Sequence, residues 1–210
     1  MTGGSGHVYA RRLIVELARA GGDVDLSITA AGLLVLRQES GLDPGERGEL
    51  LPALLDDWLG PEVARRVRLF RSDEVGAPPA SGTARTGGTI IAPCSMGTLA
   101  RIAAGFSSNL VERVADVALK ERRRLVLVPR ETPLSEIHLE NMLKLTRMGA
   151  VVLPAMPGFY HRPQSIDDLV DHVVGKLLDA LGLEHTVGAR WKGLEPAGDP
   201  DTRPAGDEAS

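Results

Sequence analysis

Two kinds of hydrophobic pattern alternate along the 210-residue chain. Short runs of branched apolar residues are separated by longer segments in which apolar side chains repeat every three or four positions. The short runs are typical of parallel strands buried on both faces, and the longer segments of the helices that cover them. The predicted strands are 23–29, 67–70, 89–93, 125–128 and 150–153. The predicted helices are 7–20, 30–38, 50–59, 61–67, 98–104, 107–122, 133–148 and 165–181.

This order predicts a single α/β domain over residues 1–192, with 193–210, rich in Gly, Pro, Asp and Ala, as a disordered tail. Helix ends are marked by local signals. Pro133 suits a first helical turn, and Ser165 to Asp168 resembles a capping box. In helix 133–148 the expected core-facing stripe is Leu134, Ile137, Met142 and Leu145. In helix 107–122 it is Leu110, Val114, Val117 and Ala118.

Polar residues follow two of the predicted strands. Arg130 and Glu131 come just after strand 125–128, and residues 160–162 (Tyr, His, Arg) lie in the loop 154–164 that follows strand 150–153. Ligands of open α/β sheets bind beyond the carboxyl ends of the strands. This cation-rich set with one carboxylate therefore suits a phosphorylated ligand and a proton transfer.

Two turns of small residues have the form of phosphate-binding turns. Residues 2–6 (Thr-Gly-Gly-Ser-Gly) open one predicted helix, and 93–98 (Pro-Cys-Ser-Met-Gly-Thr) open another. Free backbone N–H groups at such helix starts bind anions. A strand is expected before the first turn, so either it is absent from this chain or Met1 is an internal methionine at its end.

Several further positions have a functional and a plain interpretation. Thr29 either meets a ligand or caps the next helix, and Ser81 with Gly82 either approaches a flat ligand or lies in a surface loop. Cys94 is more simply explained as a packed thiol than as a nucleophile, since no base adjoins it. Arg113 and Lys120 share a helix face, where the plain interpretation is a solvated stripe. The partners in that stripe would be Glu112, Asp116 and Glu121.

Composition narrows the classes of protein. The net charge is −4 without a basic block, so nucleic-acid binding is not indicated. No apolar run approaches the roughly 20 residues of a membrane span, and no signal peptide is predicted. The single cysteine fits the cytoplasm. No cluster has metal-ligand spacing, so we expect no metal.

Four segments together resemble the UbiX/Pad-type flavin prenyltransferases. They are residues 93–100, 107–123, 125–142 and 154–171, and the stretch PRETPLSEIHLENM at 129–142 is the most specific. The resemblance spans about residues 2–192. It implies a Rossmann-like, flavodoxin-type three-layer sandwich and a homododecamer with active sites at subunit interfaces. It also implies a metal-independent transfer of a dimethylallyl group from dimethylallyl monophosphate to N5 and C6 of reduced FMN. Prenylated FMN would serve UbiD-type decarboxylases, including those of ubiquinone biosynthesis.

The resemblance also implies roles for individual residues. Glu131 would be the acid/base, with Ser5, Arg113 and Lys120 also at the reaction centre. The predicted FMN-binding residues are Gly3, Gly4, Ser5, Thr29, Ser95, Met96, Gly97, Thr98 and Arg130. The residues predicted to bind the second substrate, dimethylallyl monophosphate, are Tyr160, Lys176, Lys120, Ser81, Gly82 and Trp191. Lys176 stands where the family often has arginine, so the bidentate fork is lost while the charge remains.

Two alternatives stay open at this point. An FMN-dependent cysteine decarboxylase of the same fold would bind the cofactor similarly, but its PASANT-like turn is absent from the sequence. A flavin-binding or carrier protein without activity would bind FMN and leave dimethylallyl monophosphate unchanged.

Overall fold

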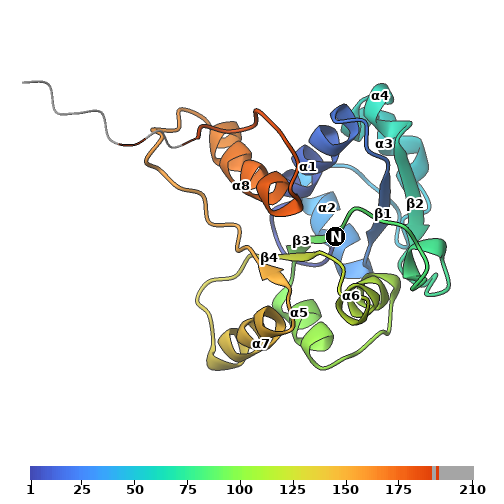
Figure 1. Ribbon diagram of the computed structural model, residues 1–210. Helices are drawn as coiled ribbons and strands as arrows, with labels where there is room; N and C mark the ends of the chain where they lie inside the picture. The colour runs from blue at the N-terminus through green and yellow to red at the C-terminus, as the bar shows by residue number, and fades with distance from the viewer. Residues whose placement is uncertain (191–192, 194–210) are drawn as a thin grey trace, which may run out of the picture.

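The computed structural model describes residues 1–190 and 193, and these form five parallel strands flanked by helices (Figure 1). The strands are β1 (Val24–Ile28), β2 (Val67–Arg71), β3 (Thr89–Cys94), β4 (Leu125–Pro129) and β5 (Val151–Val152). The α-helices are α1 (His7–Arg19), α2 (Ala30–Ser40), α3 (Leu51–Leu59), α4 (Pro61–Ala64), α5 (Met96–Ala103), α6 (Leu110–Lys120), α7 (Glu136–Arg147) and α8 (Ile166–Leu181), and a 3₁₀ turn covers Pro78–Ala80. The predicted α/β class and nearly all predicted elements are confirmed.

The strands form two parallel groups, β1–β2 and β3–β4–β5. Met1 and Thr2 lie between their facing edges, near the carboxyl ends of β1 and β3. The Met1 amino group donates to Ser27 O at 2.7 Å, and Thr29 N donates to Met1 O at 3.1 Å. On the other side Thr2 N donates to Pro93 O at 3.1 Å. Two residues thus connect the groups where a flavodoxin-type fold has its first strand.

Strand β4 lies at the centre of the hydrophobic core, because its side chains alternate between two layers. Val126 and Val128 pack into a cluster with α1 and α8, whereas Leu125 and Leu127 pack into a second cluster with α5, α6 and α7. All four side chains are fully buried. Each stabilises the fold by about 1.5–3 kcal/mol through burial. Helices on both faces make the three-layer sandwich predicted from the sequence.

Three local predictions were wrong. Helix α7 begins after Pro133, at Glu136, because Ser135 and His138 form a capping box there. Ile137 is 66% exposed and does not belong to the core-facing stripe, although Leu145 is fully buried. Val151 is also exposed, since β5 is a two-residue edge strand.

Helix α6 differs from the predicted solvated stripe at one position. Glu112 is fully buried, and its carboxylate accepts hydrogen bonds from Arg101 and from Ser108 N. The other two predicted ion pairs are present, between Arg113 and Asp116 and between Lys120 and Glu121.

Within the described residues, no helix has both the length and the apolar character needed to span a bilayer. No group of three or more His, Cys, Asp or Glu side chains in that part of the chain is arranged to hold a metal ion. Of the predicted tail, residues 193–210, the structure describes only Gly193. Trp191, which was predicted to bind substrate, lies outside the described residues.

Candidate active site

The two predicted phosphate-binding turns meet at the carboxyl end of the sheet. Thr2 is buried between them: its hydroxyl donates to Pro93 O at 2.9 Å and accepts from Ser95 N at 2.7 Å. Glycine is needed in the first turn for close packing. A Cβ on Gly3 would lie 2.8 Å from Ala31 Cβ, and one on Gly4 would lie 3.2 Å from Pro93 Cβ. The turns are therefore held together as one unit.

This unit presents backbone N–H groups that have no acceptor among the described residues. They belong to Gly3, Gly4 and Ser5 in the first turn, and to Met96 and Gly97 at the start of α5. Free N–H groups at a helix N-terminus carry a partial positive charge and bind phosphate. We call these five donors the N–H cradle, and its chemistry fits the phosphate of a mononucleotide.

Several side chains predicted to bind FMN are already engaged within the protein. Ser95 and Thr29 cap α5 and α2, accepting hydrogen bonds from Thr98 N and Gly32 N respectively. Thr98 is buried and accepts from Arg101, and the Met96 side chain packs in the core. The structure therefore places the residues at the predicted edge of the sheet but favours their backbone, rather than their side chains, as phosphate ligands.

Arg130 and Glu131 follow β4 at the same edge. The Arg130 guanidinium reaches the first turn, with Nε 3.4 Å from Ser5 O. Arg130 makes no ion pair within the described residues, so its charge is available beside the N–H cradle. Glu131 is exposed and accepts a hydrogen bond from Thr132 N at 3.0 Å. A cation and a carboxylate thus border the cradle.

Glu39, at the end of α2, is a residue of this site that the sequence interpretation missed. Its carboxylate accepts from Gly6 N at 3.0 Å and from His7 N at 3.0 Å, and lies 2.8 Å from His7 Nδ1. Desolvation raises its pKa, but hydrogen bonds from Ser5, His7 and the backbone outweigh that effect and bring the pKa to about 2. The ionised Glu39 carboxylate therefore fixes the conformation of the Gly-rich turn. Nothing local distinguishes it from an ordinary glutamate at a helix end.

Cys94 ends β3 beside the cradle but is fully buried. Burial raises the pKa of its thiol to about 12, so the thiol is not ionised at neutral pH. The interpretation as a packed thiol is confirmed.

Lys120, Ser81 and Gly82 form a second group at the amino end of the sheet. Lys120 is ion-paired with Glu121, and its Nζ would lie 3.2 Å from a Cβ on Gly82. Arg123 donates hydrogen bonds to the carbonyl oxygens of Ser81 and Gly82, which holds this loop against the end of α6.

The structure does not bring the two groups together within one chain. Lys120 precedes β4 and Arg130 follows it, so the full length of the strand separates them. A strand rises about 3.3 Å per residue, which puts the first and last residues of this five-residue strand about 13 Å apart. Arg113 lies seven residues before Lys120 on α6 and is ion-paired with Asp116 at 3.3 Å.

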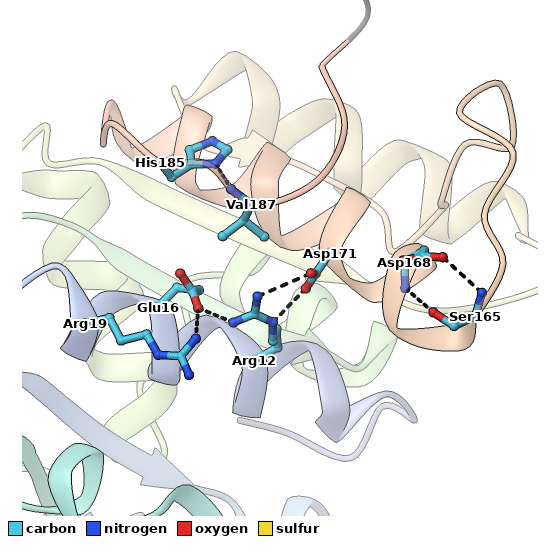
Figure 2. A network of polar contacts seen from close by, with 8 residues as sticks. All are labelled: Arg12, Glu16, Arg19, Ser165, Asp168, Asp171, His185 and Val187. Carbon is cyan, nitrogen blue, oxygen red and sulfur yellow. Dashed lines mark hydrogen bonds and ion pairs between the residues drawn. The ribbon is translucent and has the colours of Figure 1, made fainter.

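Tyr160 and Lys176 lie on the segment after β5 and on α8. Helix α8 is well anchored: Ser165 and Asp168 cap its start, and Asp171 pairs with Arg12 of α1 at 2.7 Å (Figure 2). Tyr160 is 51% exposed and its ring contacts His172 of α8. Lys176 is exposed one helical turn further along.

Comparisons with known proteins agree with this arrangement. The family model described as Flavoprotein matches residues 1–178. The chain is 51% identical over 191 residues to a protein from Alkalihalophilus pseudofirmus named flavin prenyltransferase UbiX, an alignment that covers 91% of this chain and 93% of the relative.

Two solved structures are similar over almost the whole chain. AnUbiX in complex with FMN and dimethylallyl pyrophosphate is 41% identical with a TM-score of 0.81, covering 93% of this chain and 96% of that one. A dodecameric FMN-dependent UbiX-like decarboxylase from Escherichia coli O157:H7 is 39% identical with a TM-score of 0.78, covering 92% of this chain and all of that one. The chain therefore belongs to the Flavoprotein family and, within it, to the UbiX flavin prenyltransferases.

Proposed function

We propose that this protein is a flavin prenyltransferase, which transfers a dimethylallyl group from dimethylallyl monophosphate to N5 and C6 of reduced FMN. The observation that carries the proposal is the N–H cradle with Arg130 and Glu131 at its border, in a chain that belongs to the UbiX family. The alternative of a cysteine decarboxylase is not supported by the names of these relatives.

The N–H cradle would hold the phosphate of FMN. Its five donors and the neighbouring Arg130 guanidinium supply hydrogen bonds and positive charge, which is the usual basis of phosphate binding at helix starts. Glu39 would keep the Gly-rich turn in shape while the ligand binds, since its carboxylate accepts from that turn's backbone and from His7. The bound flavin supplies the nucleophilic N5 and C6.

Phosphate leaves the prenyl group as an anion, so the transition state gains from nearby cations. Lys120, Arg130 and Lys176, with the Tyr160 hydroxyl, would supply this stabilisation. Glu131 is exposed beside Arg130, where it would pass the proton lost from N5 to the departing phosphate as the C–O bond breaks and the bond to N5 forms. Ring closure at C6 would add one proton to the prenyl double bond and release one from C6, and Glu131 would transfer that proton. Ser5 and Arg113 complete the predicted set of reacting-centre residues.

A complete site on this account takes residues from more than one subunit. Lys120 with Ser81 and Gly82 would face the N–H cradle of a neighbouring copy, since a strand length separates the two groups within one chain. Exposed apolar side chains support self-association into a homo-oligomer, which we propose is a dodecamer. They include Ile137, Leu139, Leu143, Met156 and Phe159, all at least half exposed.

We further propose that the product, prenylated FMN, passes to a UbiD-type decarboxylase in the cytoplasm. The relation to UbiD rests on the family resemblance, and it predicts that the purified protein activates a UbiD-type apoenzyme only after reaction with both substrates.

The test of the proposed activity is anaerobic reaction followed by mass spectrometry of the released flavin. Reduced FMN would be supplied with dimethylallyl monophosphate in one reaction and with the pyrophosphate in another. We expect FMN heavier by one C5H8 unit, formed faster from the monophosphate. Bound FMN of unchanged mass with both donors would contradict the proposal and favour a flavin carrier. Faster reaction of the pyrophosphate would correct the identity of the donor.

A further inference from the structure

Three aromatic rings meet where the segment between β5 and α8 contacts α8. The His161 and His172 rings are stacked, with centroids 5.2 Å apart and planes inclined by 3°. The Tyr160 ring meets both edge-on, at 5.5 Å from each. A Cβ on Gly158 would lie 2.8 Å from the Tyr160 ring and 3.2 Å from His172 Cε1, so glycine permits this close approach.

The two sides of this contact are held very differently. His172 sits on α8, which is fixed by its capping box and by the Arg12–Asp171 ion pair (Figure 2). The neighbouring Val173 and Val174 are buried. The other side is a segment of irregular backbone in which Tyr160 is 51% exposed. The ring contacts therefore link Tyr160 to the rigid part of the domain.

The stack suits neutral rings. Neither ring nitrogen of His161 has a hydrogen-bond partner within the described residues, although both atoms are buried. Burial lowers the pKa of His172, and the charges of His161 and Lys176 lower it further. The hydrogen bond from Gln164 N, with a second from Ser165 N, lowers the pKa of the Asp168 carboxyl, and the nearby His161 contributes least.

The sign of the pH effect follows from these groups. We call the arrangement with stacked rings closed, and one in which His172 is solvated open. Because the pKa of His172 is lowered in the closed arrangement, that arrangement binds fewer protons than the open one. Acid therefore favours opening, and the effect develops as the pH falls through the ordinary range of histidine, about 6.5.

We propose that the His161–His172 stack is a proton-sensitive latch that positions Tyr160, with His172 as its positioning residue. Tyr160 matters here through its proposed role in binding the prenyl phosphate, so the inference rests on the proposed function. When the His172 ring is neutral, the stack holds Tyr160 on α8. When His172 carries a proton, the cost of burying its charge and its repulsion by Lys176 release the segment.

The position of Tyr160 can be measured without the reaction. The chain has two tyrosines, so 3-fluorotyrosine gives two ¹⁹F signals in the FMN-loaded protein, and Tyr9→Phe assigns them. Between pH 7.5 and about pH 5.5, across the titration of histidine, we expect the Tyr160 signal to move to the solvent-exposed position. The Tyr9 signal should stay in place.

Substitutions separate the latch from a purely structural role. His172→Phe keeps an aromatic ring that cannot be protonated, so the Tyr160 signal should stay in the packed position at low pH. His172→Ala removes the ring, so at pH 7.5 the signal should already be shifted toward the solvent-exposed position, and it should not change further as the pH falls. His138→Gln is the matched control, because glutamine can replace His138 in the capping box of α7. It should titrate like the wild type.

The kinetic consequence falls on KM rather than kcat. As the pH falls over this range, we expect KM for the prenyl phosphate to rise about tenfold more in the wild type than in His172→Phe. The comparison with His172→Phe removes the effect of the substrate's own titration, which is common to both proteins. A Tyr160 signal that titrates equally in wild type and His172→Phe would overturn the latch, even in an active enzyme. A signal that titrates as expected in an inactive protein would leave the latch standing and refute the proposed function instead.

Discussion

The two ends of the parallel sheet differ in how much of a ligand site they form within one chain. At the carboxyl end, Thr2 joins two turns into the N–H cradle, and Arg130 reaches it without an ion-pair partner among the described residues. At the amino end, Lys120 is neutralised by Glu121 beside the Ser81–Gly82 loop. The carboxyl end can therefore bind an anion within one chain. The amino end would contribute to a ligand site only together with another surface. The proposed site at subunit interfaces would bring these two ends together.

The largest effect is expected at Glu131. Replacing it by Gln removes the proposed acid/base but keeps its size and hydrogen-bonding shape, so kcat should fall about 10²–10⁴-fold. FMN binding should be retained, because the cradle is untouched. The control is Glu140→Gln, an exposed carboxylate on α7. Turnover within twofold of wild type would remove Glu131 from the mechanism.

Arg130 tests the carboxyl end as an anion site. Arg130→Ala should weaken FMN binding about 10–100-fold, the usual worth of a charge-assisted hydrogen bond. Quenching of flavin fluorescence measures this affinity. Arg147→Ala removes an exposed arginine from the end of α7 and should bind FMN like the wild type. Equal affinity in the Arg130 and Arg147 variants would exclude Arg130 from FMN binding.

Lys120 tests the amino end. Lys120→Ala should leave FMN affinity unchanged and lower kcat/KM for the prenyl phosphate about tenfold, because one cation is lost from the phosphate site. Steady-state kinetics with Lys144→Ala as control gives the comparison, since Lys144 is an exposed lysine near the end of α7. A loss of FMN affinity in the Lys120 variant would mean that the two ends do not divide the ligands as described.

The smallest effect concerns stability at the carboxyl end. The pKa of Glu39 is held at about 2 in the folded protein, below its ordinary value of 4.5. Its stabilisation is therefore present above about pH 4.5 and is lost as the pH falls toward 2. Glu39→Gln should cost about 1 kcal/mol at pH 7, since water screens part of the interaction. Thermal melting should show the gap between wild type and variant closing with acid, and a constant gap would contradict this account.

Local patterns predicted the elements well but the contacts between elements poorly. The capping box at Ser165 and Asp168 could be predicted because both partners lie within one turn. The start of α7 was misplaced because Pro133 and Ser135 both suit a helix start, and the capping box decided between them.

The predictions for the site divide in the same way, with local features correct and distant contacts missed. The turns after the strands could be placed from the sequence, since parallel strands end at one edge. Burial of Glu112 depends on Arg101 of a different helix, and the role of Glu39 depends on a turn more than 30 positions earlier. Periodicity carries no information on such distant partners. For the same reason it could not separate Lys120 from Arg130, although both were predicted to act on phosphate.

The measurement that tests the interfacial site most directly is subunit complementation. Glu131→Gln subunits and Lys120→Ala subunits would be mixed, dissociated and reassembled, and assayed for prenylated FMN by mass spectrometry. If each site takes its two ends from different copies, about a quarter of the sites in a random mixture regain both native residues. The mixture should then be more active than either parent. Activity equal to the mean of the two parents would show that both residues serve the same chain, and would contradict the interfacial site.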